Sequence, residues 1–425
     1  MNHAPPPGWK AHKLNQLGFL GRGRSRHRPR DDASLYGGDY PFFQTGDVKA
    51  ANLYLSEYSQ TYNKKGLAQS RQWEPGTLCI TIAANIAETA ILGIRGCFPD
   101  SVIGFVADPA QANVRFIKYC MDLMKQDMQQ VSHGTTQDNL SLDKLLRFDF
   151  VVPDAREQRK IAAILSAYDD LIENNLRRIK ILEEMTQNLY REWFAEFRYP
   201  GHEDAHLVDS PLGRIPQDWE VKGAMENGNW NFIDQNVDHY EGTKRYYATA
   251  DIDGITIVSD GVDYTYKQKP SRAQKQPLLN SVWFARMQET YKVLAVARPN
   301  AALAVNAMLS SGFVGFAAPD EDSFPFLFLT IASKEFHQEK DRYCTGATQR
   351  SLTNDGLSRI LTICPPREIV QQFGSIATSS VELILSLQER SQVLRRIRDL
   401  LLPRLISGEL DVSELDIAVP KGAEA

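Results

Sequence analysis

The stretch DAREQRKIAAILSAYDDLIENNLRRIKILEEMTQNLYREWF, residues 154–194, decides the fold of this chain. Its apolar positions recur in steps of four and three residues, which is the period of a helix that packs along another helix. Neither Pro nor Gly interrupts the stretch, so it predicts one helix of about 40 residues, roughly 60 Å long. Such a long apolar seam needs a partner. The predicted seam positions are Ile161, Leu165, Ile172, Ile179, Leu182 and Leu189.

The predicted partner is a second copy of the same element. Residues 133–137 (HGTTQ) lead into the first helix and residues 345–349 (TGATQ) into a second, at a shift of 346 − 134 = 212 residues. With the same shift, Pro153 falls on Pro365. The chain is therefore predicted to consist of two related halves, each a globular region followed by a long helix. The seam positions expected in the second helix are Phe373, Ile384, Leu387, Leu394 and Leu401.

Both globular regions combine strand patterns with helical stretches, which predicts mixed α/β domains with a partly antiparallel sheet. FFQTGDV (42–48) is interpreted as a strand and turn, and YYATADI (246–252) repeats its pattern. A linker is expected between the halves and a loose tail after Leu410. Further strands are predicted at 77–83, 101–107, 281–287, 292–297 and 312–317, helical stretches at 110–130 and 324–343, and the linker at 198–216.

Composition narrows the class of protein. The 425 residues are 43% hydrophobic and 24% charged, as in an ordinary globular chain. The five cysteines form no C-x-x-C pair, so we expect no metal site and reduced thiols in the cytosol. The first ten residues lack a signal-peptide core, and no run approaches 18 apolar residues. A cytoplasmic protein without a membrane span is therefore expected.

The sequence carries none of the catalytic motifs that we sought. It contains no G-x-x-x-x-G-K-[ST] phosphate loop, G-x-S-x-G, H-E-x-x-H or zinc-deaminase pattern. The tetrapeptide of adenine methyltransferases is also missing, and Pro365-Pro366-Arg367 is interpreted as the start of a helix. We therefore predict no catalytic residues in this chain.

Basic segments with aromatic neighbours occur in both globular regions. The formal charge is −5, yet residues 1–30 contain seven Lys or Arg and no acid. Residues 21–30 (GRGRSRHRPR) are interpreted as a mobile basic loop, and residues 264–275 contain four cations and no acid. Such cations suit DNA phosphates, and Arg and Gln can also read base edges. The alternative is a solvated loop. The candidate DNA-binding residues are Arg22, Arg24, Arg26, Arg28, Lys64, Lys65, Arg71, Gln137, Lys267, Lys269, Arg272, Lys275, Gln349 and Arg350.

Three polar positions have a structural alternative. Gln137 and Gln349 lie in the matched Gly-x-Thr-Gln turns, where Gly can supply a positive φ and Thr a cap. Asn175 lies in the seam of the first helix and is interpreted as a buried polar residue that fixes helix register.

The alternation of globular region, PDAREQRKIAAIL…LYREWF helix, second globular region and CPPREI…LLPRLISGEL helix resembles a known family. It is similar to the DNA specificity (S) subunit of type I restriction–modification systems over nearly the whole chain. The fold that this resemblance implies is α+β, with two target-recognition domains joined by two long antiparallel, coiled-coil-like helices. A duplicated chain of this kind can fold with an internal pseudo-two-fold axis. The second helix departs from the pattern, because Ser380, Ser391 and Arg398 argue against tight closure of its seam.

The resemblance implies a non-catalytic subunit that recognises a split site in double-stranded DNA. Two methyltransferase (M) subunits that use S-adenosylmethionine, and ATP-dependent restriction (R) subunits where present, are the implied partners; the chain itself would hold no cofactor. The implied domains are a first target-recognition domain (1–150), a first helix region (151–200), a second target-recognition domain (201–362), a second helix region (363–412) and a tail (413–425).

Two other classes of function stay open at this point. The first is a coiled-coil scaffold whose heads bind proteins, and strong salt dependence of duplex binding would count against it. The second is a solitary nuclease or methyltransferase, for which the sequence offers no ligand set or cofactor loop.

Overall fold

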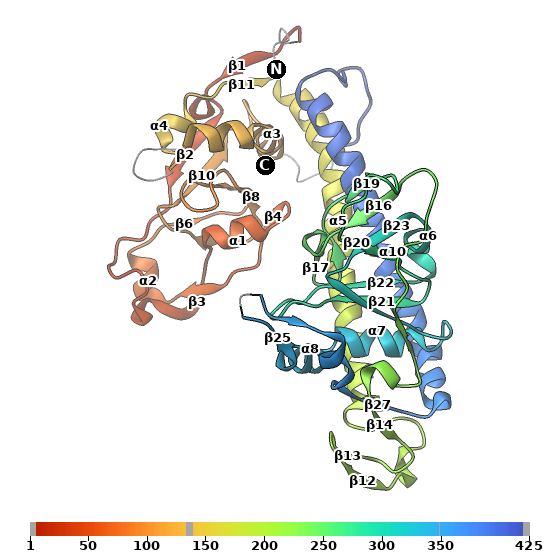
Figure 1. The fold of residues 1–425 in the computed structure, drawn as a ribbon. Coiled ribbons are helices and arrows are strands. Elements are labelled where there is room, and N and C mark those ends of the chain that lie inside the picture. Colours follow the sequence, from red (N-terminus) through yellow and green to blue (C-terminus); the bar gives the residue numbers. More distant parts are fainter. Residues whose placement is uncertain (1–5, 133–138, 348, 420–425) are drawn as a thin grey trace. The chain divides into compact units, whose positions relative to one another are not determined.

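A computed structural model of the chain describes residues 6–132, 139–347 and 349–419. It divides into a first unit, Met1–Asn174 with Val393–Ala425, and a second unit, Asn175–Gln392. The two predicted long helices are confirmed as α5 (Ala155–Phe194) and α10 (Arg367–Ile406), and each helix contributes to both units (Figure 1). Each unit also contains one globular head.

The first head begins and ends on the same antiparallel strand pair. Lys10 pairs with Val152, which joins β1 (Lys10–His12) to β11 (Phe150–Val152) just before α5 begins. Between them lies a five-stranded sheet of order β2-β10-β7-β8-β4, whose apolar face packs on α3 (Val114–Ser132). The strands are β2 (Gly18–Arg22), β4 (Tyr54–Leu55), β7 (Leu78–Thr81), β8 (Thr89–Leu92) and β10 (Val102–Ala107).

A second, smaller sheet completes the first head. Its order is β5-β3-β9-β6, with β9 parallel to β3 and antiparallel to β6. Phe42 and Tyr62 stack in its core at 4.1 Å between ring centroids. The elements are β3 (Tyr36–Phe42), α1 (Thr45–Ala50), β5 (Gln60–Tyr62), α2 (Lys64–Ala68), β6 (Gln72–Trp73), β9 (Gly96–Cys97) and α4 (Leu142–Leu145).

The second head repeats this topology. Glu220 pairs with Cys364, so β14 (Glu220–Gly223) and β27 (Leu361–Cys364) close the head as β1 and β11 close the first. The larger sheet has the order β15-β24-β21-β22, and the smaller has the order β19-β16-β23-β20 with β23 parallel to β16. The strands are β15 (Asn231–Ile233), β16 (Lys244–Tyr247), β19 (Val262–Tyr264), β20 (Ala273–Lys275), β21 (Ser281–Ala285), β22 (Val293–Val296), β23 (Ala307–Ser310) and β24 (Phe313–Ala317).

Strand order and pairing direction thus confirm the predicted internal repeat. The heads also share their short helices: α4 and α9 (Asn354–Ser358) precede the closing strands, with Ser141 and Thr353 as N-caps at the 212-residue shift. Each cap side chain accepts a hydrogen bond from a backbone N–H of the first turn. Further elements of the second head are α6 (Ala302–Asn306), β17 (Ile252–Asp253), β18 (Thr256–Ile257), β25 (Cys344–Thr345) and β26 (Ser351–Leu352).

The repeated motif FFQTGDV/YYATADI differs from its prediction. In each copy the strand ends within the first two residues, and the expected turn is a short helix: α1 in the first head and η5 (Thr249–Asp251) in the second. Asp47 accepts a hydrogen bond from the Gln44 backbone N–H at 2.7 Å, and Asp251 accepts one from the Ala248 N–H at 2.6 Å. The matched Asp therefore caps the turn, which the strand-like aromatic residues concealed.

The predicted helix over 324–343 is two helices, α7 (Phe324–Ala332) and α8 (Lys334–Arg342). Ser333 interrupts the run with an extended backbone (ψ 149°), and its Oγ accepts the Phe336 N–H at 3.1 Å. Ser333 is thus the N-cap of α8, because a serine hydroxyl satisfies an amide that the new helix leaves free.

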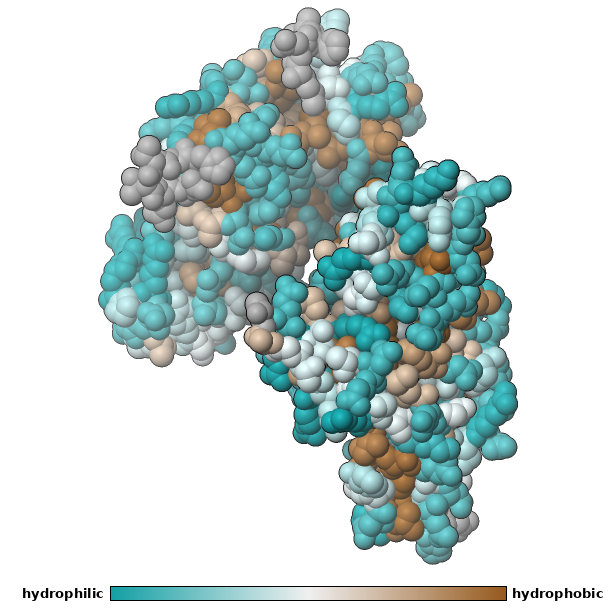
Figure 2. All heavy atoms as spheres, viewed as in Figure 1, coloured by the Kyte–Doolittle hydropathy of each residue, from teal (hydrophilic) through white to brown (hydrophobic). Residues whose placement is uncertain are grey.

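The predicted linker, residues 198–216, is not a bare connection. It contains η3 (His202–Asp204) and a hairpin of β12 (Leu207–Ser210) and β13 (Gly213–Pro216), and its Tyr199 and Ile215 are buried beside Trp219. Figure 2 shows an apolar area, coloured brown, over the end of the second unit that carries this hairpin. The exposed apolar residues of the hairpin region are Leu207, Val208 and Leu212.

The tail is also more ordered than expected where the structure describes it. Val412 is buried in the core of the first unit, and Ile417 packs against that core. Lys160 of α5 donates a hydrogen bond to the Ser413 carbonyl at 2.6 Å. The described part of the tail is therefore attached to the start of α5.

Candidate nucleic-acid interface

The basic loop of the first head is held by its neighbours rather than free. Gln69 accepts hydrogen bonds from the backbone N–H groups of Arg26 and His27, and the Ser70 hydroxyl donates to the Arg24 carbonyl at 2.7 Å. The loop thus has a defined path, which the interpretation of residues 21–30 as mobile did not anticipate. These three hydrogen bonds fix the loop backbone at Arg24, Arg26 and His27.

The arginines of this loop are not equivalent. Arg30 forms an ion pair with Asp100 at 2.6 Å, and Arg28 lies 3.9 Å from the same carboxylate while donating to the Ser25 carbonyl. Arg22, Arg24 and Arg26 are exposed, and no acidic partner is recorded for them among the described residues. The structure therefore separates the predicted run: Arg28 is partly neutralised, while the other three keep their charge available.

The other predicted cations of the first head follow β5. Asn63 caps α2 by accepting the Lys65 and Gly66 N–H groups, which exposes Lys64 and Lys65 on the first turn. Lys65 donates to the Ser34 hydroxyl at 2.5 Å. Arg71 follows α2, and its guanidinium carbon lies 4.0 Å from the centre of the Trp73 ring. These residues lie on the connection between β5 and β6, which also carries Gln69 and Ser70.

The predicted cations of the second head occupy the corresponding connection, from β19 to β20. Lys267 and Arg272 are exposed, whereas Lys275 is half-buried in β20. Lys269 donates to the Ala273 carbonyl at 2.8 Å and lies 5.4 Å from the Tyr266 ring. In both heads, therefore, a group of candidate cations lies between the strands at the two outer positions of the small sheet: Lys64, Lys65 and Arg71 in the first, and Lys267, Lys269 and Arg272 in the second.

Sequence reasoning missed an aromatic cluster beside these second-head cations. The Tyr266 ring lies 4.8 Å from His239 and 5.5 Å from Tyr240. Lys244 donates to Gln276 at 2.7 Å, and burial lowers its pKa. The run Lys244-Arg245-Tyr246-Tyr247 was a usable signal, but Arg245 is bound in two places to Asp263 and is not a free cation.

The second matched turn is the tip of the β25–β26 hairpin. Gly346 has a φ of +127°, as the structural interpretation of this turn expects. Gln349 is exposed, whereas Arg350 donates to the Cys344 carbonyl at 2.9 Å and its own carbonyl accepts the Gln288 N–H. Gln137 lies outside the described residues.

The helix seam is apolar in both units, with polar pairs at intervals. Among the contacts between the two helices, higher residue numbers on α5 face lower residue numbers on α10, so the helices are antiparallel within each unit. Among the predicted seam residues, Ile161, Leu165, Ile172, Ile179, Phe373, Ile384 and Leu387 are buried, and Leu182, Leu189, Leu394 and Leu401 are half-buried.

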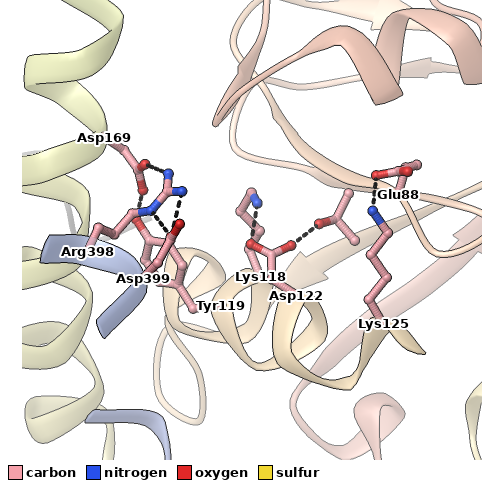
Figure 3. A network of polar contacts seen from close by, with 9 residues as sticks. Glu88, Lys118, Tyr119, Asp122, Lys125, Asp169, Arg398 and Asp399 are labelled. Atoms are coloured by element: carbon pink, nitrogen blue, oxygen red, sulfur yellow. Dashed lines mark hydrogen bonds and ion pairs between the residues drawn. The ribbon is translucent and has the colours of Figure 1, made fainter. Parts of the chain in front are cut away.

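In the first unit a charged network joins α3, α5 and α10 (Figure 3). Asp169, 6% exposed, accepts the Tyr119 hydroxyl and forms an ion pair with Arg398, both at 2.5 Å. Burial and the Asp169 charge raise the pKa of Tyr119 well above its usual value. Burial alone would lower the pKa of Arg398, but Asp169 and Asp399 raise it. Arg398, a predicted obstacle to closure, is therefore a partner in the seam.

The second unit has a neutral pair in its part of the seam. The Asn175 amide donates to the Ser391 hydroxyl at 3.2 Å, and both residues are buried. Ser391 also donates to the Leu387 carbonyl of its own helix at 2.8 Å. The predicted buried, polar Asn175 is present, and the second predicted obstacle, Ser391, satisfies its amide.

With this geometry established, comparisons with known proteins show what the chain is similar to. Residues 6–184 match the family model described as the type I restriction modification DNA specificity domain. The MjaIX specificity subunit of a type I restriction enzyme from Methanocaldococcus jannaschii is 27% identical, over 96% of this chain and 95% of its own length. The chain is therefore similar to the specificity subunits of type I restriction enzymes.

Other proteins show the same similarity. The HindI specificity subunit of Haemophilus influenzae is 22% identical, over 66% of this chain and 72% of its own length. The S subunit of a type I restriction–modification system from M. genitalium has the same fold, with a TM-score of 0.58 and 14% identity, over 95% of this chain and 98% of that chain. Specificity subunits are recognition rather than catalytic subunits, so the scaffold and solitary-enzyme alternatives are not favoured.

Two further observations concern metal binding and membrane spans. Among the described residues, no group of three or more His, Cys, Asp or Glu could hold a metal ion. None of the described helices is both long and apolar enough to cross a membrane.

Proposed function

We propose that this chain is the DNA-recognition subunit of a type I restriction–modification complex and that its two heads read the two halves of a split double-stranded site. The observation that supports this function is the position of the cations. Lys64, Lys65 and Arg71 in one head, and Lys267 and Arg272 in the other, lie on the same connection of a duplicated small sheet. A solvated charged loop has no reason to recur at one place in two heads.

The side chains on these connections suit DNA. Exposed Arg and Lys neutralise phosphates and release condensed counterions, which gives affinity. Arg forks and the Tyr and His rings of the second head supply directional contacts to bases. Because the heads carry different residues on one scaffold, each would read a different sequence.

Catalysis is assigned to partner subunits. Two methyltransferase subunits would bind S-adenosylmethionine and methylate adenine, and restriction subunits, where present, would use ATP and Mg²⁺. This chain would hold none of these cofactors, and the complex would work in the cytoplasm.

The test is a methyl-transfer assay with purified components. The chain alone, incubated with duplex DNA and labelled S-adenosylmethionine, should transfer no label, and adding the partner methyltransferase subunits should produce transfer to one specific site. Transfer by the chain alone would contradict the proposal. So would sequence-independent transfer by the complete complex.

A further inference from the structure

Arg71 differs from the other candidate cations because aromatic rings hold its guanidinium. The guanidinium carbon lies 4.0 Å from the centre of the Trp73 ring and 5.1 Å from that of Phe19. Trp73 is 3% exposed and stacks on Phe98, with ring centroids 5.0 Å apart and an angle of 17°. The arginine therefore rests on a buried aromatic layer, at a surface where Phe19 is 52% exposed.

The Trp73 ring packs on two glycines of the larger sheet. Gly21 of β2 and Gly104 of β10 are directly paired, and the ring lies over both. A Cβ at Gly104 would lie 2.7 Å from the ring, and a Cβ at Gly21 would lie 2.8 Å from it and 3.0 Å from the Arg71 guanidinium. The two contacts with the ring are shorter than Cβ atoms show in proteins, so the paired glycines are what allow the tryptophan to lie here, and a side chain at Gly21 would also crowd the arginine.

Stacking uses the face of the guanidinium and leaves its in-plane N–H donors free. Several other arginines of the heads are held by carboxylates: Arg30 by Asp100 and Arg245 by Asp263. For Arg71, by contrast, the described residues supply rings and no acid. A planar fork with fixed orientation and unused donors fits the two acceptors, O6 and N7, on the major-groove edge of guanine.

We propose that Arg71 reads a guanine in the half-site contacted by the first head. The inference rests on the proposed function, because it names one base at that interface. A phosphate contact would need only the charge, which a flexible side chain supplies as well. The aromatic rings fix the plane of the Arg71 guanidinium, and a phosphate contact does not require a fixed plane.

The matched substitution is Arg71→Lys, which keeps the charge and removes the planar fork. The experiment uses the full chain in complex with its methyltransferase subunits and measures methylation of a library of randomised sites. Both Arg71→Lys and Arg71→Ala should reduce preference for guanine at one position of the first half-site, roughly tenfold or more, and leave the second half-site unchanged. Thermal melting of each variant complex should match the unaltered complex, which separates a role in reading from a role in folding.

Arg272→Lys is the control in the other head. Arg272 also directly precedes the outer strand of its small sheet, but no stacked ring is recorded for it among the described residues. This variant should keep the base preferences of the second half-site. If Arg71→Lys keeps full guanine preference while Arg71→Ala weakens all sites equally, Arg71 is a phosphate contact and the inference is wrong. An unaltered complex without any sequence preference would instead contradict the proposed function.

Discussion

The two heads share a scaffold but differ in the side chains that it displays. In the first head the basic loop carries arginines, two of which face Asp100, and its backbone is held by Gln69 and Ser70. In the second head the basic residues lie instead on the β19–β20 connection, where lysines lie among tyrosine and histidine rings. Duplication thus preserved strand order while the displayed residues diverged, as expected if the heads read different sequences.

The helix pair shows a second contrast between the units. The seam of the first unit contains the Asp169–Arg398 ion pair, and that of the second contains the neutral Asn175–Ser391 hydrogen bond. Asp169, Asn175 and Ser391 are buried and Arg398 is partly buried, and both contacts define which residues of α5 and α10 face each other. Their expected energies differ greatly, because an uncompensated buried charge costs more than an unpaired amide.

The largest expected effect is that of Asp169→Ala. The change leaves Arg398, with 25% of its side chain exposed, without its buried partner, and should destabilise the protein by about 3–5 kcal/mol. Chemical denaturation of the full chain measures this. The double variant Asp169→Leu/Arg398→Met should recover only part of the loss, because both charges are gone but the buried Tyr119 hydroxyl still lacks its acceptor. A loss below about 1 kcal/mol, the size of a surface ion pair, would refute the buried-pair interpretation.

The two loops can be compared through salt. Replacing Arg24 and Arg26 with Ala should weaken binding to all duplexes alike and flatten the salt dependence by about 0.9 for each lost phosphate contact. Arg30→Ala is the matched control, because its charge is already paired with Asp100 and should change the slope less. In the second head, Lys267→Ala removes an exposed cation and should likewise flatten the salt dependence of binding. If Arg30→Ala changes the salt slope as much as each of the two replaced arginines does, the ion pair with Asp100 does not reduce phosphate binding by Arg30.

The neutral pair of the second unit should contribute less than the ion pair. Asn175→Ala should destabilise the protein by about 1 kcal/mol, since a neutral hydrogen bond is lost and the Ser391 hydroxyl still bonds to Leu387. The same denaturation assay applies. A loss as large as that of Asp169→Ala would erase the contrast between the two seams.

A smaller effect, on pH dependence, belongs to the second unit. Burial, with a lesser contribution from Glu184, raises the pKa of Glu183 to about 7 from 4.5. A carboxyl with a raised folded pKa binds a proton on folding, so stability should fall as pH rises from about 4.5 to 7. Glu183→Gln should raise the melting temperature at pH 8 and leave it unchanged at pH 4. If the variant and the unaltered protein melt at the same temperature at pH 8, ionisation of Glu183 does not destabilise the folded protein.

The repeat and the long helices could be predicted because their signals are local and periodic. The 212-residue shift recurs in the closing strand pairs, and the 3.5-residue period marks α5. The capped turns at Asp47 and Asp251 were missed because aromatic residues favour strands, while a single carboxylate decides the turn.

The interface was predictable in composition but not in detail. The basic connections could be located by counting cations in the sequence. The pairing of Arg28 and Arg30 with Asp100 could not be predicted, because it joins residues about 70 positions apart. The stacking of Arg71 depends on Gly21 and Gly104, which meet only when β2 pairs with β10. Contacts created by the sheet have no local signature in the sequence.

The central claim is that the heads read their half-sites independently. Its most direct test is an exchange of residues 9–152, the first head with its closing strand pair, for the first head of another family member. The hybrid is placed with its methyltransferase subunits in cells, and all methylated adenines in the genome are mapped. Independent heads predict a new sequence in one half-site and the original sequence in the other. Changes in both half-sites, or in neither, would contradict the claim.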